Sequence, residues 1–496
     1  MKTEAELEEL VRGVVAQVVG SDGSPARPPS DAPASVDRQD PAAGPSTPAE
    51  SVNEGVVRVS ATGVSGLFSS VDDAVAAART AQQRLAVEGI ERRKTYIDAI
   101  RKAGLANAER LARSAYQETG LGRFRDKVDK NVFAAERTLG VEDLEPRAFR
   151  GDHGLAVEDY LPWGIVASIT PVNSPAAFIV NHAITMLAGG NAVVFNTHPA
   201  CRNTSMATVQ LLNEAVVAAG GPDNLMSGVV EPTLASAKDL VQHRDVDMLV
   251  ITGGAALIED AFAMRKRVIA AGPGNPTAVV DETADLKRAA RELFRGGSFE
   301  NCILCIGEKT VVVSEPAAAG LLSAFDDLPV YKLGPPEVDK VFEAVVDTTG
   351  DHPVVRREFV GKDAEILARA AGISASKPIG LLLAEVDHDH PLVRMEQFVP
   401  LLPVVRARTA DDAVDLGVEV EGHNHHTVMI YSNTPDRIER FAREADAVVC
   451  VVNGCSLRGL GVDGEGYPGF TIGTVTGEGI TSARHYVKSR RHSQTR

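Results

Sequence analysis

Short runs of β-branched residues, separated by longer helical stretches, are the feature that most limits how this chain folds. Four such runs are residues 164–170, 191–196, 246–252 and 277–281. Runs of this length and composition are typical of strands buried on both faces of a parallel sheet. Amphipathic stretches such as 205–220 lie between them. The alternation predicts an α/β chain built on doubly wound parallel sheets.

The composition indicates an acidic globular protein of more than one domain. The 496 residues carry a net charge of −16, which argues against a nucleic-acid binder held by phosphate contacts. Five cysteines at irregular spacing are typical of a reducing compartment. Asn181, His182 and Asn191 interrupt the longest apolar stretch, 176–195, so no membrane span is expected. The N-terminus lacks the basic segment of a secretory signal.

The first 55 residues differ in kind from the rest of the chain. Residues 1–20 place apolar side chains at helical spacing along one stripe: Leu7, Leu10, Val11, Val14, Val15 and Val18. Residues 21–55 are rich in Pro, Ala, Ser and Asp and nearly lack large apolar side chains, so we expect a disordered linker. The short helix either packs on its own protein or docks into a groove of another protein. From Ser70, a plausible helix N-cap, amphipathic helices begin.

Two cysteines three residues apart, Cys302 and Cys305, raise the question of a metal clip, a redox pair or a single nucleophile. A zinc site needs two further ligands, and nothing marks Cys450 and Cys455 as partners. The histidine-rich stretches 387–390 and 422–426 are weak metal candidates for the same reason. A reversible disulfide between Cys302 and Cys305 stays open as a redox switch. Cys305 precedes a predicted strand, at the kind of strand-edge loop that carries functional side chains.

Two glycine patterns, 459–464 and 464–469, match G-x-G-x-x-G. Pro468 stands where a helix should begin, and too little chain remains after it for a βαβ unit. We therefore do not expect a standard phosphate cradle there.

The chain resembles the aldehyde dehydrogenase superfamily over roughly residues 60–490. Four segments in the family's order carry the resemblance: 161–199, 249–262, 270–309 and 395–405. Further segments are similar to the CoA-acylating branch found in bacterial microcompartments, whose members act in propanediol and ethanolamine breakdown: 274–285, 298–309, 425–442 and 471–484. Those enzymes begin with an amphipathic encapsulation helix, which favours a docking role for residues 1–20.

The resemblance implies a nucleophile and an oxyanion donor. The family's catalytic cysteine aligns with Cys305, and Cys302 replaces an ordinary residue. A thiolate at Cys305 would attack the aldehyde carbonyl and form a hemithioacetal. The side chain of Asn173 and the backbone N–H of Cys305 would stabilise its oxyanion. Hydride transfer to NAD would then leave a thioester on Cys305.

The general base of the hydrolytic members is missing. Their glutamate aligns with Ala270, and no carboxylate lies between Asp260 and Asp281. Without a base for water, the acyl-enzyme should resist hydrolysis and react with the thiol of coenzyme A. This absence favours the acylating branch.

The resemblance also implies the cofactor contacts. Glu396 would bind the nicotinamide ribose, and Gly253 and Gly254 would face the pyrophosphate. His198 is the candidate near the adenosine ribose. Thr170, Pro171 and Gly272 complete the expected cofactor set. Because no basic residue clearly awaits a 2′-phosphate, NAD is favoured over NADP.

The expected domains rest on the same resemblance. Residues 56–275 form an NAD-binding domain with a Rossmann-type fold and an oligomerisation hairpin near 143–161. Residues 276–445 form an α/β catalytic domain. Residues 446–496 return to the cofactor domain and end in an oligomerisation strand. A homo-oligomer, dimer or tetramer, is expected.

We expect a CoA-acylating oxidation of propionaldehyde or acetaldehyde, with NAD and coenzyme A, in the lumen of a bacterial microcompartment in the cytoplasm. Residues 1–20 would bind its shell or core proteins. Nucleic acid, membrane and metal are not expected. Two alternatives remain: a hydrolytic aldehyde dehydrogenase that makes the free acid, and a non-catalytic scaffold of the microcompartment core.

Overall fold

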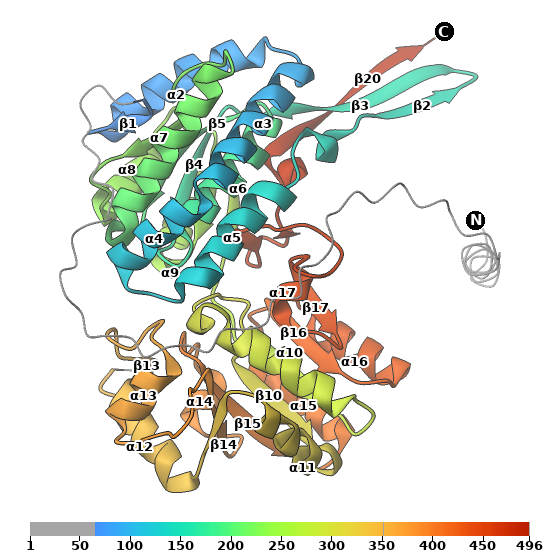
Figure 1. Cartoon of the computed structure of the whole chain (residues 1–496). Coiled ribbons are helices and arrows are strands. Elements are labelled where there is room, and N and C mark those ends of the chain that lie inside the picture. The colour runs from blue at the N-terminus through green and yellow to red at the C-terminus, as the bar shows by residue number, and fades with distance from the viewer. Residues whose placement is uncertain (1–64, 351, 496) are drawn as a thin grey trace. The chain divides into compact units, whose positions relative to one another are not determined.

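The computed structural model describes residues 65–350 and 352–495 (Figure 1). The helix predicted at 1–20 and the linker predicted at 21–55 lie outside these residues. The predicted N-cap of the first described helix is confirmed, because the Ser70 side chain accepts a hydrogen bond from the backbone N–H of Asp73.

The first large sheet is wholly parallel, with strand order β1-β6-β5-β4-β7-β8. From β4 the chain moves outward through β5 and β6, and it then returns to add β7 and β8 on the other side of β4. The switch point of the sheet therefore lies between β4 and β7, at whose carboxyl ends doubly wound folds bind ligands. The strands are β1 (Leu67–Phe68), β4 (Ile165–Thr170), β5 (Ala192–Thr197), β6 (Met226–Val229), β7 (Met248–Thr252) and β8 (Arg267–Ala271).

Eight helices of the described chain accompany this sheet. The helix α6 is apolar enough to be buried along its whole length, and it begins with Pro175 at its first turn, where a missing N–H costs nothing. The helices are α2 (Val71–Ala86), α3 (Ile90–Ala106), α4 (Ala108–Thr119), α5 (Phe124–Arg137), α6 (Pro175–Ala188), α7 (Arg202–Ala218), α8 (Leu234–Gln242) and α9 (Ala255–Phe262).

The second large sheet is also parallel, with strand order β11-β14-β15-β10-β9-β16-β17. Its last strand lies beyond residue 445, so the sheet extends past the expected end of the catalytic domain. The strands are β9 (Thr277–Val280), β10 (Thr310–Ser314), β11 (Val330–Leu333), β14 (Leu381–Glu385), β15 (Leu401–Ala407), β16 (Thr427–Tyr431) and β17 (Val449–Val452).

Helices α10 to α17 accompany the second sheet. Its central β9 and β10 are completely buried, as expected of strands covered on both faces. The helices are α10 (Leu286–Ser298), α11 (Glu315–Ala324), α12 (Pro335–Val345), α13 (Ala364–Ala370), α14 (Pro391–Arg394), α15 (Ala410–Glu421), α16 (Pro435–Ala445) and α17 (Ser456–Gly459).

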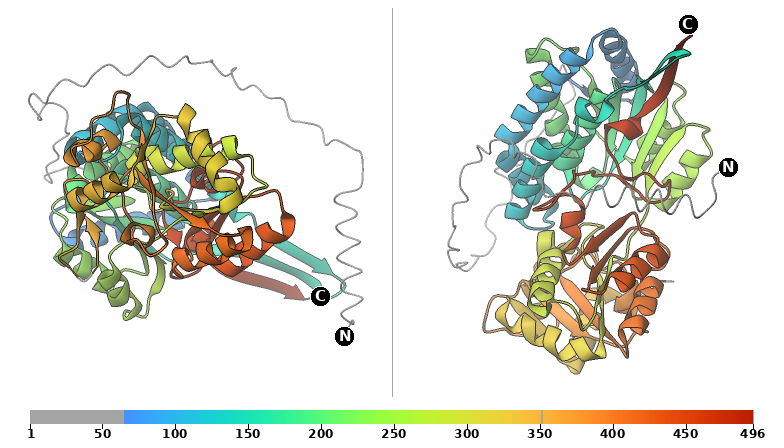
Figure 2. Two further views of the ribbon diagram at one scale, coloured as in Figure 1. Left: turned by 90° about the horizontal axis from the view of Figure 1, so that it is seen from below. Right: turned by 90° about the vertical axis from the view of Figure 1, so that its right-hand side faces the viewer.

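Three smaller sheets complete the described fold. Strands β2 (Arg147–Gly151) and β3 (Gly154–Pro162) form a hairpin where the sequence predicted one, and β20 (Val487–Thr495) pairs antiparallel with β3. Both views of Figure 2 show the three strands running side by side to the C-terminus. Their role in oligomer formation stays a prediction. The remaining pairs are β12 (Val346–Asp347) with β13 (Val354–Val355), and β18 (Ile472–Gly473) with β19 (Gly479–Ile480).

Among the described helices, none is long and apolar enough to cross a membrane.

Candidate active site

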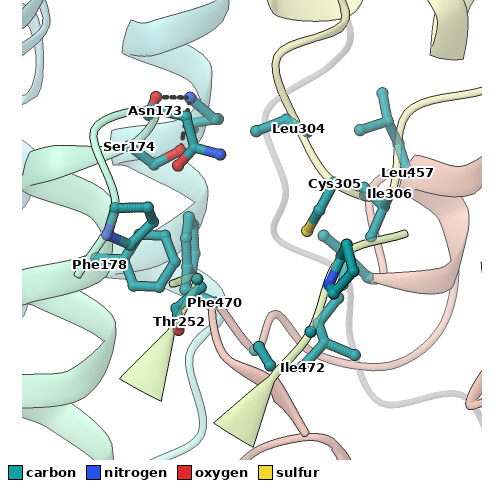
Figure 3. A pocket seen from close by; sticks show the side chains of 18 of the residues that line it. Asn173, Ser174, Phe178, Thr252, Leu304, Cys305, Ile306, Leu457, Phe470 and Ile472 are labelled. Atoms are coloured by element: carbon teal, nitrogen blue, oxygen red, sulfur yellow. Dashed lines mark hydrogen bonds between the residues drawn. The ribbon is translucent and has the colours of Figure 1, made fainter. Parts of the chain in front are cut away.

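A cavity of about 970 Å³ opens between residues that follow strands of both large sheets. In Figure 3, Cys305 lies on one side of this space and its sulfur points into it, while Asn173 lies on the other side. Thr252, at the end of β7, and the Asn173 loop (residues 171–174), after β4, mark the switch point of the first sheet at the cavity. The cavity therefore occupies the position at which a fold of this topology binds ligands.

Cys305 sits in a tight turn that we call the nucleophile loop (residues 299–309), between α10 and β10. Glu300, Asn301 and Cys302 have φ angles of 53°, 53° and 58°, which non-glycine residues adopt at a cost of roughly 1–3 kcal/mol each. The buried ammonium group of Lys309 donates hydrogen bonds to the carbonyl oxygens of Cys302 (2.7 Å) and Leu304 (3.3 Å). A cation at the centre of the loop thus stabilises carbonyls that would otherwise be buried without donors.

A second set of bonds fixes the loop from outside. The Asn301 amide donates to the Gly361 carbonyl oxygen (2.9 Å) and to Asp363 (2.8 Å), and its oxygen accepts from Arg123 (2.8 Å). The strained conformation is therefore held by side-chain hydrogen bonds on several sides.

The thiol of Cys305 is protonated in this state. Burial raises its pKa to about 12, with a further increase from the nearby Glu396 carboxylate, and the positive charge of Lys309 acts in the opposite direction. The thiolate expected from the sequence is therefore not the resting form, and a proton has to leave before Cys305 can attack a carbonyl.

Asn173 is held against the nucleophile loop. Its side-chain Nδ2 donates a hydrogen bond to the carbonyl oxygen of Ile303 (3.1 Å), and its Oδ1 is buried without a partner among the described residues. The loop that carries it begins at the end of β4 and stops at Pro175, the first residue of α6. An amide donor and a thiol thus face the same cavity from two different sheets.

The cofactor candidates lie at the same cavity. Gly253 and Gly254 have φ angles of 87° and 78° just before α9, a conformation that favours glycine and exposes backbone to the cavity. Burial raises the pKa of Glu396 to about 7, opposed by the charge of Lys309. The Glu396 Oε1 is buried without a partner among the residues described. It therefore has a free acceptor position facing a ligand site.

Of the residues predicted for the site, seven line the cavity: Pro171, Asn173, Gly253, Gly254, Gly272, Cys305 and Glu396. Thr170 and His198 do not. Thr170 is buried at the end of β4, and its carbonyl accepts from the backbone N–H of His198 (3.1 Å). His198 is exposed, and its Nδ1 accepts from the N–H of Ala200. These two residues adjoin each other at the edge of the sheet, outside the cavity wall.

Cys302 has no access to the cavity. It is buried, and its sulfur lies 3.4 Å from the Glu308 carbonyl oxygen and 3.2 Å from the Lys309 ammonium group. No group of three or more His, Cys, Asp or Glu residues in the described chain is placed to hold a metal ion. The two glycine patterns fall in loops after the short helix α17, and only Gly469 of them lines the cavity.

Three charged side chains near the cavity were not singled out from the sequence: Lys130, Glu300 and Lys309. Each is almost fully buried. A lysine directly before a wholly apolar strand, as at Lys309, is the one local signal that could have been noticed.

His426 was considered from the sequence only as a metal ligand. It is buried, its Nε2 lacks a partner in the described structure, and burial lowers its pKa to about 4. A Cβ at Gly274 would lie 2.9 Å from its ring and 3.1 Å from the Cys305 carbonyl oxygen. A neutral imidazole therefore packs close to the nucleophile's backbone, with only a glycine between them.

The model of the aldehyde dehydrogenase family matches residues 50–467. This chain belongs to the aldehyde dehydrogenase family. The resemblance found in the sequence and the predicted α/β fold class are confirmed. The chain is 43% identical over 429 residues to the acetylating acetaldehyde dehydrogenase EutE of Salmonella typhimurium, covering 86% of this chain and 91% of EutE.

Two solved aldehyde dehydrogenase structures are similar throughout. One is the propionaldehyde dehydrogenase from the fucose utilisation microcompartment of Clostridium phytofermentans, at a TM-score of 0.84 and 39% identity over 87% of this chain and 98% of that one. The other is the Rhodopseudomonas palustris propionaldehyde dehydrogenase with bound CoA and an acylated cysteine, at a TM-score of 0.84 and 38% identity over the same shares.

Proposed function

We propose that this protein is an NAD-dependent, CoA-acylating aldehyde dehydrogenase that converts a short aldehyde to its acyl-CoA through a thioester on Cys305. The observation that carries the proposal is the composition of the cavity. It combines Cys305 and Asn173 with a wall of Ala271, Gly272 and Pro273 at the stretch where a hydrolytic enzyme has its glutamate.

The first step forms a bond between the Cys305 sulfur and the aldehyde carbon, as the thiol proton leaves. The negative charge that develops on the aldehyde oxygen is met by Asn173 Nδ2 and the Cys305 backbone N–H. To do so, Asn173 gives up its bond to the Ile303 carbonyl. Loss of a hydride then turns the hemithioacetal into a thioester on Cys305.

Bound NAD supplies the hydride acceptor, and the cavity fits it. The unpartnered Glu396 Oε1 is placed to accept from ribose hydroxyls, and the turn of Gly253 and Gly254 lets backbone approach a pyrophosphate. Thr170 and His198 remain candidates for the same cofactor, near the adenosine end.

Release of the acyl group requires an acceptor that needs no strong base. Four of the carboxylates that line the cavity are exposed: Asp129, Glu136, Glu259 and Asp463. Glu396 is the buried one, and it is assigned to the ribose. A thiol attacks a thioester well without base catalysis of water, so coenzyme A is the preferred acceptor. The acyl-CoA leaves, and Cys305 regains its proton.

The aldehyde end of the cavity is apolar. Phe178 and Phe470 meet edge to face with ring centres 5.5 Å apart, and Leu304, Ile306 and Leu457 lie across from them in Figure 3. This environment supports acetaldehyde or propionaldehyde as substrate. The names of the relatives include both.

We also propose that the enzyme works as a homo-oligomer in the lumen of a bacterial microcompartment. The sources of related enzymes support this location. Residues 1–20 would bind shell or core proteins there, whether or not catalysis is needed for their organisation. The scaffold alternative predicts that a Cys305→Ala variant has an unchanged cellular phenotype.

The deciding experiment incubates the purified protein with propionaldehyde and NAD, with and without CoA, and identifies the acyl product. CoA-dependent NADH formation that ends in propionyl-CoA is expected. Turnover without CoA that ends in propionate would instead identify a hydrolytic enzyme. In that case, Glu396→Gln should abolish hydrolysis if the buried carboxylate replaces the missing base.

A further inference from the structure

A fully buried cluster of charged residues connects the two halves of the candidate active site. Its anion is Glu300, five residues before Cys305, and its cations are Lys127 and Lys130 on successive turns of α5. The Glu300 Oε2 lies 3.0 Å from the Lys127 ammonium group and 2.5 Å from that of Lys130. The exposed fractions of the three side chains are 0%, 3% and 7%.

Glu300 ties the nucleophile loop to the start of α5. Besides the two lysines, its Oε1 accepts from the backbone N–H of Arg123 (2.9 Å), and its own N–H donates to Asp126 (2.7 Å). A Cβ at Gly122 would lie 2.6 Å from the carboxylate, so the glycine leaves room for it. The carboxylate therefore holds the first of the three residues with positive φ in the loop.

Lys130 alone continues the connection to the opposite wall. Its ammonium group donates to the Asn173 carbonyl oxygen (3.0 Å) and to the Ser174 hydroxyl (2.8 Å). These bonds appear as dashed lines beside Asn173 and Ser174 in Figure 3. With Glu300 as its third acceptor, the three donors of the ammonium group are all used. Lys127 has its bond to the same carboxylate, and it does not line the cavity.

We propose that Lys130 is a positioning residue, which sets the placement of the Asn173 oxyanion donor relative to Cys305 by bridging the Asn173 loop to Glu300 of the nucleophile loop. The two loops belong to different sheets, and Asn173 Nδ2 touches Ile303 in the resting state. A fixed backbone at residue 173 lets the amide move from that carbonyl to the oxyanion without the loop moving away. This inference rests on the proposed function for its chemistry.

The matched pair Lys130→Met and Lys127→Met tests the proposal. Both remove one cation from Glu300, and only the first removes the bonds to the Asn173 loop. The readout is the burst of NADH with propionaldehyde and NAD in the absence of CoA, which reports Cys305 acylation alone. Lys130→Met should slow the burst by about 100-fold, as expected for a displacement of roughly 1 Å. Lys127→Met should remain within about threefold of wild type.

A second readout separates positioning from general damage. Alkylation of Cys305 by iodoacetamide needs the sulfur and no oxyanion donor, so its rate and pH profile should be the same in both variants and in wild type. Lys130→Arg keeps the charge near Glu300, yet a planar guanidinium cannot reproduce three bonds from one nitrogen. It should fold as wild type does and still show a slow burst, which covers the case in which Lys130→Met fails to fold.

Equal bursts in Lys130→Met and Lys127→Met would overturn the proposal, and so would a slow burst accompanied by equally slow alkylation. A wild-type burst without propionyl-CoA formation would instead overturn the proposed function, because the burst precedes the step that uses CoA. The two failures are therefore distinguishable.

Discussion

The side-chain nitrogen of Asn173 donates a hydrogen bond of 3.1 Å to the carbonyl oxygen of Ile303, two residues before Cys305. The donor proposed for the oxyanion is therefore occupied by the nucleophile loop in the resting state. Binding of an aldehyde exchanges one acceptor for another, and the developing negative charge is the stronger of the two.

Replacement of this amide tests its role directly. Asn173→Ala is expected to lower kcat by about 10²–10³-fold, the effect of removing one oxyanion donor. The KM for NAD should change little, because Glu396 and the Gly253 turn are untouched. Steady-state kinetics with propionaldehyde, NAD and CoA measure both quantities. Unchanged kcat would contradict the assignment.

The two cysteines of the nucleophile loop make a matched comparison. Cys305→Ser should lower turnover by roughly 10³-fold or more, since the nucleophile is lost. Cys302→Ser should retain most of the activity, because Cys302 is buried beside Lys309 outside the cavity. NADH formation by the two purified variants decides between them. The reverse order of activities would assign the nucleophile to Cys302.

The affinity for NAD is expected to depend on the protonation of Glu396. Its pKa of about 7 is raised by burial, so the carboxyl becomes protonated as the pH falls through that value and accepts poorly from ribose hydroxyls. Calorimetric titration from about pH 8 to about pH 6 should show the Kd rising, by up to tenfold per unit below the pKa.

Glu396→Gln is the control for this titration. The buried carboxyl of Glu308 also has a pKa of about 7, and it accepts from the Ser456 backbone and hydroxyl. If Glu396 controls binding, the variant binds NAD weakly at every pH with a flat profile. A profile as steep as that of wild type would assign the titration to another group.

Removal of residues 1–20 should separate location from catalysis. All residues that line the cavity lie between Asp129 and Val475, so the truncated enzyme should keep its kcat and KM. In cells that assemble the compartment, it should move from the compartment fraction to the cytosol. Loss of turnover in the truncated protein would show that the segment supports the fold.

The backbone of the fold is predictable from local pattern in the sequence. The strands β4, β7 and β9 fall within predicted β-branched runs, because strands covered on both faces require continuous apolar side chains. The site was predictable where one residue carries the chemistry, as with Cys305 and Asn173, both of which line the cavity.

The charged cluster could not be predicted in the same way. Lys127 and Lys130 lie in a polar helix, where lysines three residues apart are usually solvated. Their burial depends on Glu300, more than 160 residues later in the chain, and on a backbone conformation that no propensity favours at Glu300. A contact between distant loops leaves no periodic trace in a single sequence.

The wall of the cavity has a consequence for how the protein is made. Phe470, Ile472 and Val475 stand among the last residues of the 496-residue chain, and they close a space that Lys130 and Asn173 begin. The β20 strand then pairs with β3, which is synthesised more than 300 residues earlier. A ribosome that has already released Cys305 into the cell has therefore not yet made an enzyme, and the reactive site is completed only as translation ends.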